Sequence, residues 1–446
     1  MNKTIYALAT AFGKSGVAVI RVSGKDALKS ISEMTNIKID TIKPRYAYFT
    51  SLKHSQTKNV LDKALVLYFK GPNSFTGEEV VEFHLHGSKA VISSVLDSLS
   101  YLSEFRLAEP GEYSKRAFRN NKMDLTEAEG LADLIESETS EQQRIAIRQM
   151  EGSLKNLYED WRSRFIKILA YLEAFIDFPD EDIPEEQIVK LTGQVESLRS
   201  EISSHLDNNN YGERLRDGFR VVVMGPPNAG KSSLLNAVTK RQAAIVSDIA
   251  GTTRDAIDVY LDINGYPVIF TDTAGVRKTD EEIESQGIDI AIDKASNADL
   301  VLCLYDASEY DKTIFNEFTK SFKNKILYIA NKSDLLSSEQ CSKLVKEDVL
   351  PISAKDNSSV DVLLNKIGAT IDVMIGSASS EVITRTRYKE ALRDVLECLD
   401  RFSFENIIEL SAEDIRLAAR SLGIITGRID VEELLDRIFG DFCIGK

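Results

Sequence analysis

Cysteine is scarce in this sequence: its 446 residues contain four cysteines, and no two of them form a CxxC pair. This scarcity excludes a disulfide framework and gives no sign of a zinc site, so we expect a reducing compartment, most simply the cytoplasm. Long hydrophobic runs are missing as well. The longest apolar stretches fall far short of the ~18–20 residues that a membrane-spanning helix needs, so the sequence predicts no membrane association.

A positive net charge is also missing. The chain carries a net charge of −15, which argues against indiscriminate coating of nucleic acid. The charge is uneven, however, because residues 1–120 hold 17 Lys and Arg against 11 Asp and Glu, a balance of +6 that leaves −21 for the rest. The first segment could therefore offer basic surface to RNA. Ordinary variation between domains would explain the same difference, and both interpretations stay open.

The composition and periodicity that are present indicate a globular protein of several domains. With 43% hydrophobic and 28% charged residues, the length predicts about three domains. Residues 1–120 alternate short β-type runs, such as 17–22 and 80–85, with turns and two helical stretches, which is typical of an α+β domain. Cys303 lies inside a later apolar run, 300–304, which predicts a buried structural thiol.

Helical periodicity follows the first segment and returns near the end of the chain. Between the helical parts, residues 219–372 alternate strand, loop and helix, as in a mostly parallel sheet covered by helices. We therefore expect one helical domain that is interrupted by an inserted α/β domain. The expected boundaries are 1–120 for the α+β domain, 121–216 and 377–446 for the two helical parts, and 217–376 for the inserted domain.

A phosphate-binding loop is the clearest motif. Gly225-Pro-Pro-Asn-Ala-Gly-Lys-Ser232 fits GxxxxGK[ST], follows an apolar strand and opens a helix at Ser233, which is the context that the motif requires. Its glycines let backbone N–H groups wrap phosphates at a helix N-terminus. Lys231 would reach the β and γ phosphates, and Ser232 would hold Mg²⁺. The alternative, a chance match to this motif in a loop, has a small prior because the flanking strand and helix both agree with the motif.

Three further motifs indicate guanine. Asn331-Lys-Ser-Asp334 follows a strand, and the carboxylate of Asp334 can accept both N1–H and the exocyclic amino group of guanine, a paired donor that adenine lacks. Ser353-Ala-Lys355 fits a loop that supports the base, and Asp272-Thr-Ala-Gly275 fits the site of Mg²⁺ and the γ-phosphate. Each short motif is weak alone, but all four in this order predict GTP binding.

The glutamine that orients the attacking water in Ras-like enzymes has no counterpart here. In those enzymes it follows DxxG, whereas this sequence continues with Val276 and Arg277. Another group must therefore align the water and neutralise the charge that develops between the β and γ phosphates, a task that an arginine finger performs elsewhere.

Several longer motifs are spread over essentially the whole chain. They are GPNSFTGE at 71–78, PGEYSKRAF at 110–118, DFPDEDI at 177–183, AIVSDIAGTTRD at 244–255 and the terminal FCIGK at 442–446. Together they closely resemble the motifs of the MnmE (TrmE) family of tRNA-modification GTPases. The resemblance implies an α+β folate-binding N-terminal domain that forms a homodimer, a helical domain, and an inserted Ras-like P-loop GTPase domain.

The resemblance further implies a potassium-dependent GTPase that is activated when its G domains dimerise. K⁺ would take the place of the arginine finger. Its implied ligands are Asn228, Ser247, Ile249 and Thr252. Thr253 would join Ser232 at Mg²⁺, Lys231 would assist catalysis, and Glu284 would orient the water indirectly. Without the resemblance, Glu284 is one acid of several, and a solvated surface is the alternative.

The residues expected to bind GTP come from the phosphate loop, the 247–253 segment, the 272–275 motif and the two base loops. They are Asn228, Ala229, Gly230, Lys231, Ser232, Ser233, Ser247, Asp248, Ile249, Ala250, Gly251, Thr252, Thr253, Asp272, Thr273, Ala274, Gly275, Asn331, Lys332, Asp334, Ser353, Ala354 and Lys355.

For the first domain, the resemblance implies a site for 5-formyl- or 5,10-methylene-tetrahydrofolate. Arg21, Glu82 and Lys122 would line it, with Lys446 reaching in from the tail. Cations suit the glutamate carboxylates of folate, and Glu82 suits the donors of its pterin ring. Read without the resemblance, Arg21 is a surface or salt-bridge residue. Cys443 is either a catalytic thiol of the modification step or a structural one.

The implied function is GTP hydrolysis in the service of tRNA modification. With the FAD-containing partner MnmG, in a heterotetramer, the protein would form the 5-carboxymethylaminomethyl or aminomethyl group on the wobble uridine of certain tRNAs, using a tetrahydrofolate one-carbon unit. Two alternatives stay open. One is a GTP-gated ribosome-assembly switch of the Era-like type, which shares the G motifs but lacks the first domain and the tail. The other is a folate enzyme that the GTPase regulates.

Overall fold

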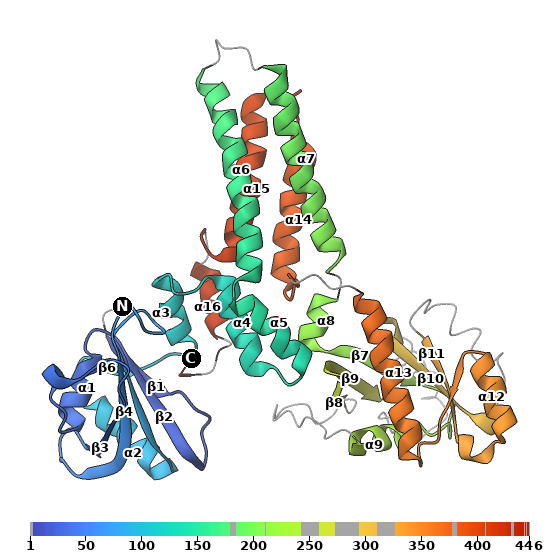
Figure 1. Ribbon diagram of the computed structural model, residues 1–446, viewed down its shortest axis with the longest axis horizontal. Coiled ribbons are helices and arrows are strands. Elements are labelled where there is room, and N and C mark those ends of the chain that lie inside the picture. Colours follow the sequence, from blue (N-terminus) through green and yellow to red (C-terminus); the bar gives the residue numbers. More distant parts are fainter. Residues whose placement is uncertain are drawn as a thin grey trace, which may run out of the picture. The chain divides into compact units, whose positions relative to one another are not determined.

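The computed structural model describes most of the chain. The described residues are 3–178, 184–209, 211–241, 258–272, 294–309, 326–376, 381–405, 407–429, 432–440, 442 and 444–445. They form two compact units (Figure 1): Met1–Ala132 with Gln149–Ala170 and Ile415–Lys446, and Asp133–Arg148 with Tyr171–Asp414. The four boundaries expected from the sequence stay a prediction. Across these ranges, no helix has both the length and the apolar composition to span a bilayer.

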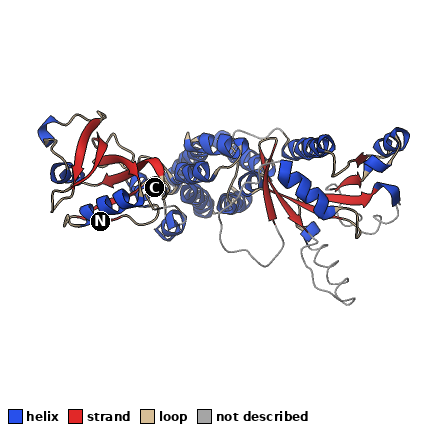
Figure 2. Ribbon diagram, turned by 90° about the horizontal axis from the view of Figure 1, so that it is seen from below, coloured by secondary structure: helices blue, strands red, loops and turns tan. Residues whose placement is uncertain are grey.

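The first unit contains a six-stranded sheet with the order β3-β4-β5-β2-β1-β6. Its strands are β1 (Thr4–Leu8), β2 (Ser15–Ser23), β3 (Tyr48–Lys53), β4 (Val60–Phe69), β5 (Val80–Gly87) and β6 (Phe105–Leu107). Neighbouring strands are antiparallel except β1 and β6. Helices α1 (Ala27–Met34) and α2 (Lys89–Ser100) cover one face (Figures 1 and 2), because Ile31 and Val95 share one apolar core with Phe83. The predicted α+β fold is confirmed.

Helices complete this unit and bring in the C-terminal tail. They include α3 (Glu112–Arg119), α16 (Glu432–Gly440), and parts of α4 (Leu125–Glu136), α6 (Ser153–Asp177) and α15 (Ile408–Thr426). Phe439 and Phe442 pack with Leu125 in a small apolar cluster. Beyond them, Ile444 bridges to Pro110, and a Cβ on Gly445 would overlap the carbonyl of Leu8. The tail therefore lies against the first strand, where its glycine is required.

The second unit holds a further sheet, with the order β12-β11-β10-β7-β9-β8. Its strands are β7 (Phe219–Met224), β8 (Asp258–Ile263), β9 (Tyr266–Asp272), β10 (Leu300–Asp306), β11 (Ile326–Asn331) and β12 (Val349–Pro351). All pairs are parallel except β8 with β9, so the mostly parallel sheet is confirmed. Cys303 is buried in β10, and burial raises the pKa of its thiol to about 12, as expected for a structural cysteine.

Helices surround this sheet and join it to the helical part. They are α5 (Ser140–Met150), α7 (Glu185–Asp207), α8 (Gly212–Asp217), α9 (Lys231–Arg241), α12 (Ser338–Lys346), α13 (Asn357–Ile375) and α14 (Thr386–Arg401). Helix α7 precedes the sheet in the chain and α14 follows it, yet the two pack side by side (Figure 1) and are joined by an ion pair between Arg199 and Asp400. This packing confirms that the sheet is inserted between two parts of one helical region.

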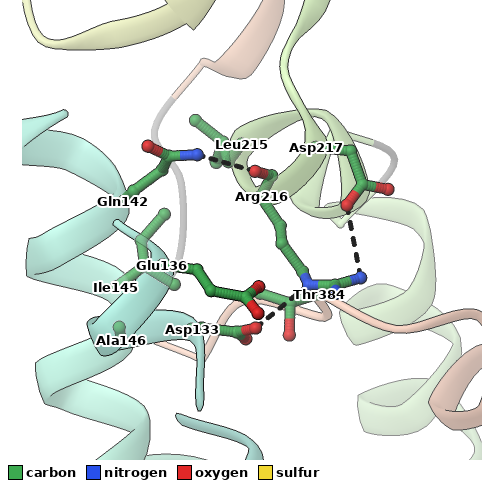
Figure 3. Close-up of a pocket in the computed structure, with 9 residues that line it drawn as sticks. All are labelled: Asp133, Glu136, Gln142, Ile145, Ala146, Leu215, Arg216, Asp217 and Thr384. Carbon is green, nitrogen blue, oxygen red and sulfur yellow. Dashed lines mark hydrogen bonds and ion pairs between the residues drawn. The ribbon is translucent and has the colours of Figure 1, made fainter. Parts of the chain in front are cut away.

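An acidic side chain joins the two connections of the inserted sheet. Asp133, on α4, accepts a hydrogen bond from Arg216 (3.0 Å), just before β7 (Figure 3). It accepts another from Arg385 (2.6 Å), just after the sheet. Gln142 on α5 donates to the Arg216 carbonyl oxygen (2.7 Å). The Asp133 side chain is 10% exposed, so both links to the sheet are held at a largely desolvated carboxylate.

Replacing Asp133 by asparagine is expected to destabilise the second unit by about 2–3 kcal/mol, because two partly buried guanidinium groups lose the charged carboxylate that they share. Urea unfolding followed by circular dichroism would measure the loss. The matched control is Asp400→Asn, whose carboxylate also pairs with an arginine but is 55% exposed, so less than about 1 kcal/mol is expected. Equal losses in the two variants would contradict the role of Asp133.

Candidate functional site

The predicted nucleotide residues lie at one edge of the second sheet. The carboxyl ends of β7, β9, β10, β11 and β12 meet there because these strands are parallel. Strand β7 has β10 on one side and β9 on the other, and ligands of open α/β sheets bind at such a change in strand order.

The loop after β7 has the backbone conformation that phosphate binding needs. A Cβ on Gly225 would overlap the Leu304 carbonyl, and one on Gly230 would overlap the Asn331 side chain, so both positions need glycine. Asn228 adopts a left-handed conformation (φ 62°) between them, and α9 begins at Lys231. The Lys231 ammonium donates to the carbonyl oxygens of Gly225 (2.7 Å) and Pro226 (3.0 Å). The loop thus ends in a helix N-terminus with a cation folded across it, an arrangement suited to phosphate.

Asn331 joins the phosphate loop to the base loop. Its side chain is buried at the end of β11, where Nδ2 donates to the Ala229 carbonyl oxygen (2.8 Å) and Oδ1 accepts from the Ala354 amide (3.1 Å). Both of its polar atoms are therefore used to hold two loops at a fixed separation. The residue acts as a scaffold between the two loops, and its expected contact with GTP stays a prediction.

Asp334 has the geometry for reading guanine. It lies in the short 3-10 helix Ser333–Leu335, exposed, and the Ser353 hydroxyl donates to its Oδ1 (2.7 Å). Ser353 is itself buried and receives support from Ser359, whose hydroxyl accepts from its amide (2.7 Å). One carboxylate oxygen is thus anchored while the group faces solvent, so the carboxylate can accept a pair of N–H donors in one plane.

Lys332 pairs with a residue that the motif search missed. Its Nζ donates to Oδ2 of Asp306 (2.6 Å), and that hydrogen bond lowers the pKa of Asp306 to about 2. Asp306 ends β10, the strand next to β11. The sequence signal that could have identified Asp306 is an acid at the end of the strand that lies next to β11. The ion pair holds the lysine stem beside the base loop, where its aliphatic part can cover a planar base.

The structure describes the positions of four other expected GTP-binding residues. Asp272 ends β9 opposite Val223, and Ser232 and Ser233 are exposed in the first turn of α9. Lys355 is exposed in the loop after β12. The remaining candidates lie outside the described residues: Ser247, Asp248, Ile249, Ala250, Gly251, Thr252, Thr253, Thr273, Ala274, Gly275, Glu284, Cys443 and Lys446.

In the first unit, two of the expected folate residues form an ion pair. Arg21 on β2 stands opposite Glu82 on β5, and its Nε donates to Oε1 of Glu82 (2.9 Å). His84 Nε2 lies 3.2 Å from the other oxygen of Glu82. The Arg21 guanidinium also lies over the rings of Phe75 and Tyr113, at 5.6 and 5.7 Å from their centres. The pair is therefore partly desolvated and packed against two rings, unlike an ordinary surface salt bridge.

Lys122, in the connection between α3 and α4, lies against the loop that carries Phe75. Its Nζ donates to the Pro72 carbonyl oxygen (2.9 Å), and its side chain packs near Gly77, which has a left-handed conformation (φ 77°). The 71–78 motif thus links Lys122 to the ring that faces Arg21. Sequence reasoning named the motif but missed Phe75, Tyr113 and the contact of His84 with Glu82.

The inserted parallel sheet, with its phosphate loop and guanine-type base loop at one edge, defines a P-loop GTPase. More particularly, the chain belongs to the MnmE family: the MnmE helical domain matches residues 125–443, and the family described as GTP-binding protein TrmE N-terminus matches residues 4–122. The resemblance drawn from the sequence motifs is thereby confirmed.

Individual relatives match along their full length. The tRNA modification GTPase MnmE of Paramagnetospirillum magneticum is 47% identical and that of Rickettsia akari 46% identical, each over 446 residues that cover 100% of both chains. Among solved structures, a variant of Era from Aquifex aeolicus bound to GDP and AlF4⁻ is 25% identical with a TM-score of 0.28, covering 40% of this chain and 66% of that chain.

Proposed function

We propose that this protein is a potassium-activated GTP hydrolase that modifies the wobble uridine of certain tRNAs. With an FAD-dependent partner, MnmG, it would form the 5-carboxymethylaminomethyl or aminomethyl group, taking the one-carbon unit from tetrahydrofolate. The observation that carries the proposal is the full-length similarity to proteins named tRNA modification GTPase MnmE. The proposal includes a homodimer, a heterotetramer with MnmG, and a cytoplasmic location.

The phosphate loop supports the hydrolytic part. The exposed hydroxyl of Ser232 at the start of α9 suits Mg²⁺, with Thr253 as its second protein ligand. The exposed amide of Asn228, held in the left-handed conformation, suits a monovalent cation, with Ser247, Ile249 and Thr252 as further ligands. When bound, K⁺ would supply positive charge beside the phosphates. Lys231 would place its ammonium on the β and γ phosphates, and Glu284 would hold the attacking water through a second group.

The ion pair of the first unit supports the folate part. Glu82 accepts from Arg21 and contacts His84, yet a carboxylate has about four acceptor positions, so it can also take the N–H donors of a pterin ring. Arg21, Lys122 and Lys446 would attract the carboxylates of the glutamate tail. Of the tail in which Cys443 and Lys446 are proposed to act, the described residues Ile444 and Gly445 lie against Pro110 and Leu8.

The match of the TrmE N-terminus to residues 4–122 favours tRNA modification over the ribosome-assembly alternative. An Era-like switch has no need of that domain or of the C-terminal tail. The folate-enzyme alternative keeps the domain but predicts folate turnover without GTP.

Deletion of the gene is expected to remove the wobble-uridine modification, which mass spectrometry of nucleosides from bulk tRNA would measure. The wild-type gene should restore it, whereas Lys231→Ala and Arg21→Ala should restore little, because the first loses phosphate contact and the second the folate contact. Lys343→Ala, an exposed lysine on α12, is the matched control and should restore it fully. Unchanged wobble uridines after deletion would refute the proposed function.

A further inference from the structure

A cleft of about 630 Å³ opens in the first unit. It lies among the end of α3, the connection to α4, the helix α6, and the residues that follow α15. Its volume falls within the range of about 300–1,000 Å³ that is usual for ligand sites. Its charged lining consists of Arg119, Lys155, Arg162, Arg428, Asp124 and Glu159, in which cations outnumber acids four to two.

Internal ion pairs hold two of these cations in place. Glu159 accepts from Nε of Arg428 (2.6 Å), and Glu127, behind the lining, accepts from Lys155 (2.9 Å). The Arg428 side chain is nevertheless 56% exposed. A guanidinium carries five N–H donors in a planar fork, more than one carboxylate can take, so Arg428 keeps donors for a second acceptor. The pairing therefore orients the cation and leaves it able to bind an anion.

Two buried polar atoms of the lining have no hydrogen-bond partner in the described part of the chain. Within the described residues, neither Nε of Arg162 nor Oδ2 of Asp124 makes a hydrogen bond. The other oxygen of Asp124 accepts from the Thr126 hydroxyl and the Glu127 amide, both at 2.8 Å. Burial raises the pKa of Asp124 to about 6, with Glu127 and Lys155 as the nearby charges, so the carboxylate is still mostly ionised at neutral pH. The cleft thus offers donors from cations together with an unsatisfied acceptor.

We propose that this cleft binds the ribose–phosphate backbone of RNA. Phosphate oxygens accept hydrogen bonds and suit the arginines Arg119, Arg162 and Arg428. A ribose 2′-hydroxyl donates one, which suits Asp124, and DNA has no such group. An anion without a hydroxyl donor would leave the carboxylate unsatisfied and repelled. The inference rests on the proposed function, which makes tRNA the RNA in question.

The test uses the full-length protein and two synthetic hairpins, an RNA with the sequence of a tRNA anticodon stem–loop and a DNA of the same sequence. Fluorescence anisotropy is measured at a fixed K⁺ concentration over a series of NaCl concentrations. Arg428→Gln and Arg119→Gln should each weaken RNA binding about tenfold and reduce the slope of log affinity against log salt by about one. Asp124→Asn should lower the preference for RNA over DNA at least about fivefold, because an amide nitrogen replaces the acceptor.

The matched control is Arg164→Gln on α6, an arginine outside the cleft lining that pairs with Asp160, and its RNA binding should match the wild type. If the cleft variants bind RNA as this control does, or if wild type does not prefer RNA, the cleft assignment is overturned. A loss of folate affinity with unchanged RNA binding would overturn it too. Wobble-uridine analysis after gene deletion is scored separately: unchanged uridines refute the proposed function, whatever the binding result.

Discussion

An Asp334→Asn variant is expected to bind GTP about 10²–10³-fold more weakly than wild type. Guanine offers N1–H and an amino group side by side, and the carboxylate held by Ser353 can accept both. An asparagine keeps one acceptor and turns an amino group toward the guanine amino group, which leaves buried donors unpaired. Titration calorimetry with GDP and GTP would measure the loss.

The same variant should gain affinity for xanthosine nucleotides, whose ring has a carbonyl where guanine has its amino group. The amide nitrogen of asparagine would donate to that carbonyl, so the preference between the two bases should reverse. Glu339→Gln, an exposed acid on α12, is the control and should leave base selectivity unchanged. If Asp334→Asn still selects GTP as wild type does, Asp334 does not read the base.

Exchange of K⁺ for Na⁺ at constant ionic strength is expected to lower the rate of GTP hydrolysis at least about 100-fold, with little change in nucleotide affinity. The reason is that the cation is proposed to do the work of an arginine finger, and such charge stabilisation acts on the transition state. Phosphate release under saturating GTP gives the rate, and equilibrium binding of a fluorescent GDP gives the affinity.

Asn228→Ala should show the same loss in K⁺ and should no longer distinguish K⁺ from Na⁺, because its amide is the one proposed ligand whose position is described. Asn236→Ala, an exposed asparagine on α9, is the matched control and should keep the K⁺ response. Equal wild-type rates in the two salts would refute the role of the cation, and the assignment of Asp334 would be unaffected.

Much of the nucleotide edge could be predicted because its signals are local. GxxxxGK[ST] specifies glycines at positions where a Cβ would overlap a neighbouring strand, and the motif directly precedes α9. A strand followed by Asn331 and Asp334 places both residues at the carboxyl end of a parallel sheet. Each of these motifs occupies a short stretch of sequence, so its spacing can be recognised without the fold.

Partners that come together across the fold could not be predicted in this way. Asp133 binds Arg216 and Arg385, which are 83 and 252 residues away in the sequence. Nothing in the spacing of acids and arginines distinguishes these partly buried ion pairs from exposed ones. The same holds for the cleft in which Arg428 lies with Asp124. Periodicity reports which face of an element is apolar, and motifs report short loops. The packing of distant segments decides which charged side chains lie next to one another away from water. The strength of their ion pairs depends on that packing, which the sequence pattern does not show.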